Sequence, residues 1–470
     1  MDLARSAETP SPDALPCADG KLGNYLSGDV PDENKWADCV HCGLCLEACP
    51  TYLETGHEHQ SPRGRVHLIK AVAEGKIGLN ESFMDPVFTC LDCRACETAC
   101  PSNVQVGGLI EEARGQVRRA HPLKGWKGWV SRFFLHGVFP HPGRLEMLGK
   151  GLRLLKRSGL SSFARRIGLM KLLPSQLEEM ERVTPIPGLP VRKKLPEVVP
   201  ARGKRKERVA LLTGCVMDAV FGDVNEATVR VLTRNGYEVH IPRSQTCCGA
   251  LHVHAGDREA GRELALRNME AFSDADHVLV NAAGCGCAMQ EYPELFREDP
   301  ALRQKAEAFA EKVMDVSRFL TRYGFERPKG EIRARASYHD ACHLAHGQGV
   351  REEPRWILRS IPGLEWVEMA NADRCCGSAG IYNLTHPEMA GAVLRRKMED
   401  VPEDAELIPM GNPGCMLQMS VGVLREGRRS KVVHTMELLD RSYRIGDREG
   451  KEASSCSDGK SGGWILSSGN

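Results

Sequence analysis

The sequence predicts a multidomain protein in which a small, mainly α-helical domain precedes two duplicated α/β modules. The chain has 470 residues, which is too long for one simple domain. Its 19 cysteines are unevenly placed, because two runs of identical spacing lie near the N-terminus and a second cysteine pattern occurs twice further along. Hydrophobic residues make up 41% of the chain, which is enough to build several buried cores.

The two cysteine runs, at residues 39–50 and 90–101, both read C-x2-C-x2-C-x3-C-P. This is the spacing of bacterial two-cluster ferredoxins, in which the fourth cysteine of each run reaches the other cluster. Zinc sites use pairs of ligands instead, and disulfides need an oxidising compartment that nothing else indicates. The sequence therefore predicts two [4Fe–4S] clusters, the first held by Cys39, Cys42, Cys45 and Cys100 and the second by Cys90, Cys93, Cys96 and Cys49.

A helical pattern lies between the two runs. Apolar residues within 66–75 follow helical spacing and the pattern ends at a glycine, which favours a small helical ferredoxin-type domain over residues 31–113. Two basic residues, Arg63 and Arg65, precede this pattern. They either lie near a cluster, where their charge would raise its reduction potential, or they begin a solvated helix.

Residues 114–206 form a basic, amphipathic linker region with 22 lysines and arginines against 5 aspartates and glutamates, although the whole chain carries only +1. Its tryptophans and phenylalanines, and leucines at helical spacing (Leu145, Leu148, Leu152 and Leu155), favour packing on protein over contact with a membrane interface. Because the rest of the chain is acidic, no binding to nucleic acid is expected. No run is long and apolar enough to span a bilayer.

The second cysteine pattern occurs once in residues 207–327 and again in residues 328–445. Each copy has a first cysteine, then Cys-Cys-Gly, then Gly-Cys, and the corresponding cysteines lie 127 to 130 residues apart. A repeat of this kind indicates duplication and a pseudo-two-fold arrangement. The cysteines are Cys215, Cys247, Cys248, Cys285 and Cys287 in the first copy, and Cys342, Cys375, Cys376 and Cys415 in the second.

These cysteines follow predicted strands of a parallel sheet. Residues 209–212 and 277–280 have the composition of buried strands, and residues 260–272 and 387–398 have helical patterns. Parallel sheets carry their sites at the carboxyl ends of strands, where these cysteines fall. Adjacent cysteines form poor disulfides, so these thiols either bind iron and sulfide or are buried, inert side chains.

Both copies resemble the cysteine-rich CCG domain of the heterodisulfide reductase family, in which each complete module can hold a non-cubane [4Fe–4S] cluster. The resemblance implies one or more additional clusters here, with a fifth ligand from a final C-x2-C. The first copy instead offers Cys285 and Cys287, and the second offers Cys415 with Gln418 in place of another cysteine.

Histidines accompany both copies. They either hydrogen-bond to cluster sulfurs, replace a missing cysteine ligand, or have an ordinary structural role. They are His252 and His254 in the first copy, and His339, His343 and His346 in the second.

The whole arrangement, over roughly residues 31–445, resembles the iron–sulfur subunits of glycolate oxidase (glycolate dehydrogenase). The strings that carry the resemblance are Cys49–Tyr52 with Ser61–Arg65, Tyr338–Gln348, and Arg374–Asn383. The resemblance implies the electron-transfer subunit of an oxidoreductase, in a hetero-oligomeric complex with an FAD-containing subunit that oxidises glycolate or D-lactate. Electrons would pass to a quinone or another membrane acceptor. The alternatives are the iron–sulfur subunit of a glycerol-3-phosphate or D-lactate dehydrogenase, and a catalytic subunit like heterodisulfide reductase.

Motifs of other enzyme classes are missing from the sequence. It contains no G-x-G-x-x-G fingerprint, no Walker or kinase set and no hydrolase triad, so no catalytic residue is expected on this chain. The first twenty residues lack the order of a signal peptide, and we expect a cytoplasmic protein, peripheral at the cytoplasmic face of the inner membrane. The polar tails, residues 1–30 and 446–470, are predicted to be disordered, and their Cys17 and Cys456 are excluded as ligands.

Overall fold

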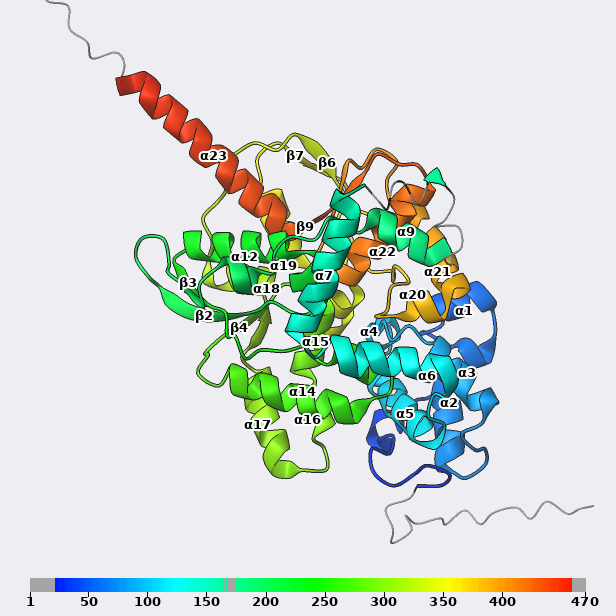
Figure 1. The fold of residues 1–470 in the computed structure, drawn as a ribbon. Coiled ribbons are helices and arrows are strands. Elements are labelled where there is room, and N and C mark those ends of the chain that lie inside the picture. Colours follow the sequence, from blue (N-terminus) through cyan, green and yellow to red (C-terminus); the bar gives the residue numbers. More distant parts are fainter. Residues whose placement is uncertain (1–21, 160, 162, 164–165, 168–174, 459–470) are drawn as a thin grey trace, which may run out of the picture.

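The computed structural model describes residues 22–458 apart from 160, 162, 164–165 and 168–174. They form a helical N-terminal part, a helical linker and two α/β modules that pack together (Figure 1). Cys17 lies outside the described residues, as do all of residues 1–21 and 459–470 of the two predicted tails.

The N-terminal part consists of short helices, with no strand among the described residues before the linker. The predicted helical pattern forms α2, where Pro62 occupies the first turn and the Ser61 hydroxyl accepts a hydrogen bond from the Gly64 N–H. The apolar side chains of α2 are buried with those of α3 and α5. The elements are η1 (Glu33–Lys35), α1 (Pro50–Thr55), η2 (Glu58–Gln60), α2 (Pro62–Ala73), α3 (Glu81–Thr89), α4 (Ala95–Thr98) and α5 (Val106–Ala120).

Residues 22–30 are packed onto this part, so the prediction of a disordered tail over residues 1–30 is wrong for them. Tyr25 is 2% exposed, and its hydroxyl donates to the Ile69 carbonyl at 3.0 Å. The Asp29 carboxylate accepts a hydrogen bond from Arg258 of the first module at 3.0 Å. These two contacts, together with hydrogen bonds between the Gln116 side chain and the backbone of residues 26–29, order a segment whose composition is polar.

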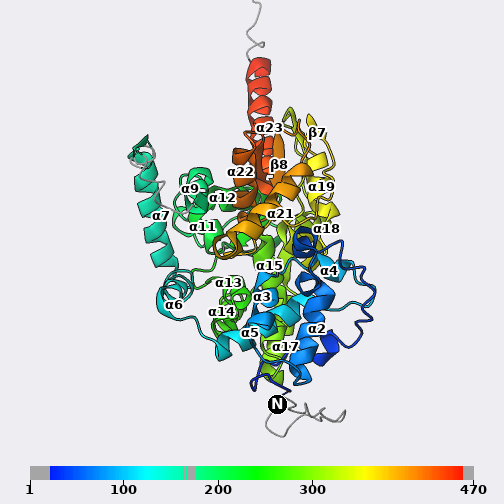
Figure 2. The same ribbon diagram turned by 90° about the vertical axis from the view of Figure 1, so that its right-hand side faces the viewer.

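The linker runs from the N-terminal part to the first sheet, and Figure 2 shows α6 and α7 along one side of the molecule. In its π-helical turn η3, Leu135 and Val138 are buried. The linker elements are α6 (Gly125–Arg132), η3 (Phe133–Val138), α7 (Pro142–Arg157), α9 (Ser175–Val183) and α10 (Val191–Lys194).

The first module contains a five-stranded sheet in the order β1-β3-β2-β4-β5. All neighbouring strands are parallel except β1, which pairs antiparallel with β3 at the edge. The elements are β1 (Val198–Val199), β2 (Glu207–Leu212), α11 (Val216–Val220), α12 (Gly222–Arg234), β3 (Tyr237–His240), α13 (Ala250–His254), α14 (Arg258–Ala271), β4 (Val278–Val280), α15 (Ala283–Gln290), α16 (Tyr292–Leu295), α17 (Pro300–Ala310), β5 (Val313–Asp315) and α18 (Val316–Tyr323).

The second module contains a parallel four-stranded sheet in the order β7-β6-β8-β9. This order matches β3-β2-β4-β5 of the first module. The cysteine loops follow β2, β3 and β4 in the first module and the corresponding β6, β7 and β8 in the second. The elements are β6 (Ala334–Ala336), η5 (His343–Gly347), α19 (Glu352–Arg359), β7 (Leu364–Trp366), α20 (Tyr382–Thr385), α21 (Pro387–Glu399), β8 (Leu407–Met410), α22 (Pro413–Arg425), β9 (Lys431–His434) and α23 (Thr435–Asp458).

The two modules share one hydrophobic core that contains buried residues of both sheets. The loop after β4 meets the loop after β8: the Ala283 N–H donates to the Gly411 carbonyl at 2.9 Å, and the Gly284 N–H donates to the Asn412 side chain at 3.2 Å. Contact between the same loop of each copy is what a two-fold relation between the modules requires.

The last helix, α23, begins in the core and projects from the molecule (Figure 1). Met436, Leu439 and Tyr443 on its first turns are buried against the first module. The predicted disordered tail from residue 446 is wrong as far as residue 458, because the helix continues to there. A helix with the length and apolar character to cross a bilayer does not occur in the described part of the chain.

Candidate metal centres

Two cavities in the N-terminal part are lined by the cysteines of the two runs. The structure brings the members of each predicted quartet together, and Cys96 lines both cavities. The first cavity is lined by Cys39, Cys42, Cys45, Cys96 and Cys100, and the second by Cys49, Cys90, Cys93 and Cys96.

The backbone between the cysteines explains how each run curves around its cavity. His41 and Gly43 in the first run have φ of 54° and 89°, and Asp92 and Arg94 at the same positions of the second run have φ of 52° and 62°. These are left-handed conformations that residues other than glycine seldom adopt. A reversal after each cysteine lets three side chains of one run face the same point.

A buried arginine lies beside the second cavity. Arg65 is 1% exposed, and its guanidinium donates to the Cys49 sulfur at 3.8 Å and to the Pro86 carbonyl at 2.7 Å. Arg63 is half-buried near the first cavity and donates to the His41 carbonyl at 3.2 Å. Of the two alternatives for these arginines, the structure supports a position next to a cysteine group.

Four thiols of the first module gather at the carboxyl ends of β2, β3 and β4. The sulfurs of Cys215 and Cys247 are 3.5 Å apart, and the Cys248 side chain interacts with those of both Cys247 and Cys285. The neighbouring Cys247 thiol and burial hold the pKa of Cys215 well above its usual range. In their thiolate form these four side chains would repel one another unless a metal cation were bound between them.

Cys287 lies apart from this group. It shares α15 with Cys285, and residues two apart on a helix do not face each other. Its thiol lies against Gly347 of the second module. Burial raises the pKa of Cys287 to about 11, although the positive charge of Arg94 opposes the rise. The structure therefore brings only Cys285 of this pair to the other first-module thiols.

The second module gathers its four cysteines in the same way. The Cys375 side chain interacts with Cys342, and Cys376 interacts with both Cys375 and Cys415. Two polar groups point at sulfur: the Gly377 N–H donates to Cys375 at 3.4 Å, and the Asn412 side-chain amide donates to Cys415 at 3.4 Å. Donors of this kind stabilise thiolates in cluster sites.

The residue at the place of a missing cysteine does not join the thiols. The side-chain oxygen of Gln418 accepts a hydrogen bond from Asn383 at 3.2 Å, on the short helix α20. Gln418 is buried there.

Three of the five singled-out histidines have partners other than sulfur. His252 Nε2 lies 2.6 Å from the Leu135 carbonyl of the linker. His254 pairs with two carboxylates of the N-terminal part, and His346 contacts the Thr98 hydroxyl at 2.9 Å.

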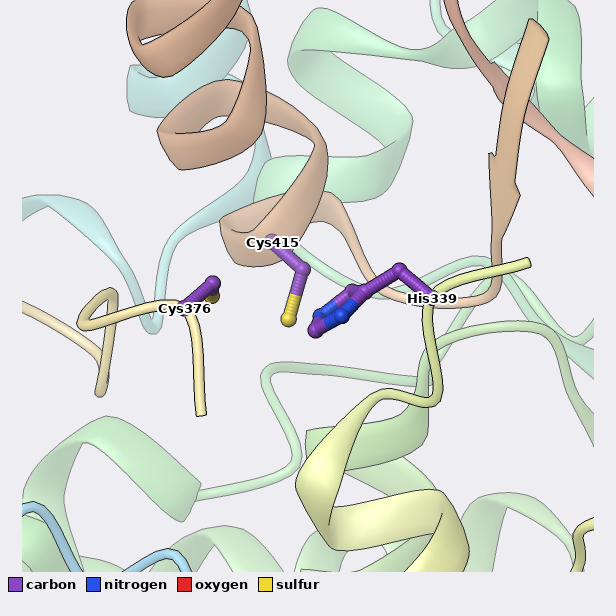
Figure 3. A group of neighbouring side chains, drawn as sticks. All are labelled: His339, Cys376 and Cys415. Carbon is purple, nitrogen blue, oxygen red and sulfur yellow. The ribbon is translucent and has the colours of Figure 1, made fainter. Parts of the chain in front are cut away.

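The other two histidines lie at the second module's thiols. His343 Nδ1 is 3.5 Å from the Cys342 sulfur. His339 reaches the other side of the group, where one of its ring nitrogens and the sulfurs of Cys376 and Cys415 all lie within 4.8 Å of one another (Figure 3).

The N-terminal part meets the second module at a pair of thiols. The Cys93 side chain interacts directly with that of Cys375, and both are buried in a small apolar cluster. The Tyr382 hydroxyl of α20 donates to the Thr89 carbonyl at 2.8 Å beside this contact. The second N-terminal thiol group and the second-module thiols are therefore adjacent.

A buried charged network joins the N-terminal part to the first module. His254 Nδ1 lies 3.1 Å from carboxylate oxygens of both Asp92 and Glu111, and Arg94 donates to Glu291 at 2.8 Å. Burial disfavours the charged imidazole, but these two carboxylates outweigh it and raise the pKa of His254 to about 9. This network could not be predicted from the sequence, because His254 and Glu291 are distant along the chain from Asp92, Arg94 and Glu111.

The linker covers the first module's thiols. Phe139 and Leu145 pack against the cluster that contains Cys215 and Cys247. The aromatic residues before them remain outside, with Trp126 72% and Trp129 67% exposed. Part of the predicted apolar stripe therefore packs on this chain, and part faces outward.

The donor sets fit iron–sulfur clusters. Thiolates are the soft ligands that bind such clusters, and metal binding removes the protons from buried thiols. Burial raises the pKa of Cys90 to about 11, while Arg65 and Arg114 favour its thiolate form. Groups of four thiols with nearby cations and N–H donors are suited to clusters with net negative charge.

Three family profiles match the chain in these same regions. The profile of the 4Fe-4S dicluster domain matches residues 35–104, and that of the linker region of the glycolate oxidase iron-sulfur subunit matches residues 126–184. The profile of the cysteine-rich domain matches twice, at residues 209–290 and 336–420. Together with the donor sets, these matches identify the chain as an iron–sulfur protein.

Curated relatives share most of the length of the chain. It is 42% identical over 417 residues to the probable glycolate oxidase iron-sulfur subunit of Bacillus subtilis (strain 168), covering 87% of this chain and 94% of that protein. It is 31% identical over 418 residues to the glycolate oxidase iron-sulfur subunit of Escherichia coli (strain K12), covering 86% and 93%. Lactate utilization protein A of Oceanobacillus iheyensis is 32% identical over 235 residues, covering 50% of this chain and 96% of that protein.

Proposed function

The chain belongs to the family of glycolate oxidase iron–sulfur subunits, and on that premise we propose that it is the electron-transfer subunit of a complex that oxidises glycolate. The observation that carries this proposal is the adjacency of the thiol groups, from the two N-terminal quartets through the contact of Cys93 with Cys375 into the modules. Iron–sulfur clusters, when bound, accept and release single electrons. A chain with several adjacent cluster sites is suited to relaying electrons between partners.

We propose that the eight cysteines of the two runs are the ligands of two [4Fe–4S] clusters. The cavities that they line support the prediction that the fourth cysteine of each run binds the other cluster. Cys49 then belongs to the second quartet and Cys100 to the first. Arg65 has the role of a buried cation that favours the reduced, more negative state of the second cluster.

We propose a further iron–sulfur centre in each module. The ligands in the first module are Cys215, Cys247, Cys248 and Cys285, and those in the second include Cys342, Cys375, Cys376 and Cys415. Cys287 is not among them, because its thiol faces Gly347 and Arg94 instead.

The proposed complex contains an FAD-carrying subunit that removes two electrons from glycolate, and this chain passes them singly to a quinone or another membrane acceptor. The chain has no catalytic residue of its own in this scheme. We place it in the cytoplasm, peripheral at the cytoplasmic face of the inner membrane. The exposed Trp126 and Trp129 among basic residues support this place, because such side chains favour the interface of an anionic bilayer.

We retain the predicted division into a ferredoxin-type domain, a linker and two modules, but we change the start of the first domain and the end of the second module. The N-terminal domain includes residues from 22 onward, since Tyr25 is part of its core. The second module extends to residue 458, since α23 is continuous to there.

A second candidate substrate is D-lactate. The likeness of half of this chain to lactate utilization protein A favours it, since both substrates are small 2-hydroxy acids. Reductase chemistry of the heterodisulfide type has less support, because both modules lack the final C-x2-C.

The test is co-purification under anaerobic conditions with the flavoprotein that binds the full chain. We expect reduction of the clusters of this chain by glycolate through that flavoprotein, with slower reduction by D-lactate and none by glycerol 3-phosphate. Reduction by another of these substrates alone would reassign the partner, and a chain without iron after reconstitution would refute the electron-transfer role.

A further inference from the structure

The loop after β6 carries a buried imidazole into the thiol group of the second module. His339 is 0% exposed, and neither of its ring nitrogens has a hydrogen-bond partner among the residues that the structure describes. In Figure 3 its ring and the Cys415 sulfur point toward each other, and Cys376 lies on the opposite side of that sulfur. Buried imidazole nitrogens without partners are costly, so this arrangement calls for a ligand.

Hydrogen bonds hold the loop that carries the imidazole. The His339 N–H donates to the Pro409 carbonyl of β8, and the Asp340 N–H donates to the Ala372 carbonyl, both at 3.0 Å. The Asp340 carboxylate is held by two hydrogen bonds from Arg355, at 2.9 Å and 2.7 Å. The backbone that carries His339 is therefore anchored, and its buried ring lies among the thiols.

We propose that His339 is a ligand of the iron–sulfur centre in the second module, so that four thiolates and one imidazole form the donor set. The proposal rests on the module centres proposed above. Gln418, at the place of the missing cysteine, is engaged with Asn383. His343 lies at Cys342, on the other side of the group, so His339 is the imidazole beside Cys376 and Cys415.

The first module provides an internal comparison. Three residues before its first cysteine it has Leu212, whereas the second module has His339 at this position before Cys342. Leu212 is buried and apolar. The two centres are therefore different: the first has thiolates only, and the second has a neutral donor as well.

Two alternatives fit less well. A structural histidine in this protein finds a backbone partner, as His434 does with the Asn281 carbonyl at 2.8 Å. A zinc ion takes four donors in a structural site, while five are gathered here.

The test uses the full chain with histidine labelled by nitrogen-15, reconstituted anaerobically with iron and sulfide. Pulsed EPR spectra are recorded across a redox titration for the wild type, for His339→Leu, which copies the first module, and for His339→Cys. His252→Gln is the matched control, because His252 is equally buried but its ring contacts the Leu135 carbonyl and the His136 ring of the linker.

We expect a strong nitrogen coupling in the wild type and in His252→Gln, and its complete loss in both His339 variants. His339→Cys should retain iron at the wild-type level and shift one midpoint potential to a more negative value, because a thiolate replaces a neutral ligand. The N-terminal cluster signals should be unchanged in every variant.

Three results would overturn the proposal: a coupling that persists in His339→Leu, a visible second-module centre without nitrogen coupling in the wild type, or zinc in place of iron. Iron confined to the two N-terminal clusters would refute the module centres themselves and leave the role of those two clusters intact. The wild-type isotope spectrum decides the question even where a variant fails to fold.

Discussion

The thiol of Cys93 in the N-terminal part is in direct contact with the thiol of Cys375 in the second module. Along the chain the N-terminal part is followed by the first module. In space, however, its second thiol group contacts the second module. The first-module Cys248 borders the same hydrophobic core as Cys376 and Cys415. The second N-terminal quartet therefore lies next to the thiols of the second module.

We predict that Cys375→Ser perturbs the second N-terminal cluster as well as the second-module centre. The substitution replaces the group against which Cys93 packs, so the EPR line shape and midpoint potential of that cluster should change. Cys247→Ser, at the corresponding position of the first module, is the control and should leave both unchanged. Equal effects of the two variants would show that the Cys93 contact has no influence.

We predict that Arg65→Gln lowers the midpoint potential of the second cluster and destabilises the N-terminal part. The variant removes a buried positive charge beside Cys49 and leaves the Pro86 carbonyl without its donor, at a cost of about 1–3 kcal/mol. Potentiometry and urea unfolding measure the two effects. Arg63→Gln, which changes a more exposed arginine, should shift the first cluster only weakly, and a larger effect there would contradict this assignment.

We predict that Cys285→Ser removes iron from the first module and that Cys287→Ser does not. Cys285 interacts with Cys248, whereas the Cys287 thiol faces Gly347 across the module boundary. Iron and sulfide analysis of the two purified variants, relative to wild type, decides the matter. Iron loss in Cys287→Ser at the same level as in Cys285→Ser would restore the alternative that both cysteines are ligands.

The strand order and the grouping of thiols follow from features that a sequence displays. Residues 209–212 of β2 are a run of apolar residues, and the cysteine of the following loop recurs 127 residues later, so the α/β repeat could be predicted from spacing. The choice between Cys285 and Cys287 as a ligand could not be predicted in this way, because it depends on which face of α15 meets the second module.

Other features depend on packing between distant segments. Tyr25 lies in a polar stretch that is ordered by contacts with distant residues, such as the hydrogen bond from its hydroxyl to the Ile69 carbonyl. His339 was one of five histidines with similar neighbours in the sequence, and its place among the thiols depends on the register of β6 against β8. A lack of hydrogen-bond partners at a buried ring cannot be read from a linear sequence.

We predict that His434 makes the stability of the chain fall in mild acid. Burial lowers the pKa of His434 to about 4, and its neutral ring donates to the Asn281 carbonyl and accepts from the Met436 N–H. The unfolded chain takes up a proton below its ordinary pKa and the folded chain does not, so stability present at neutral pH is lost as the pH falls from about 6.5 toward about 4.

The measurement is urea unfolding at about pH 7.5 and about pH 5.5, where His434 should account for a loss of about 1 kcal/mol. His434→Gln retains an amide donor for the Asn281 carbonyl and cannot titrate, so its stability should fall by that much less over the same interval. An identical pH dependence in the variant and the wild type would contradict the prediction.

We predict that alanine at the glycine of the second Cys-Cys-Gly is far more damaging than alanine at the first. Gly249 and Gly377 have φ of 88° and 86°, which alone costs an alanine about 1–2 kcal/mol. At Gly377 a Cβ atom would also lie 2.7 Å from the Ala390 carbonyl oxygen, whereas at Gly249 the nearest atom would be 3.5 Å away. Gly377→Ala must therefore move the loop that carries Cys375 and should lose second-module iron, while Gly249→Ala should retain first-module iron at reduced stability. Iron analysis and thermal unfolding of both variants test this, and equal iron retention in the two would show that the loop tolerates the displacement.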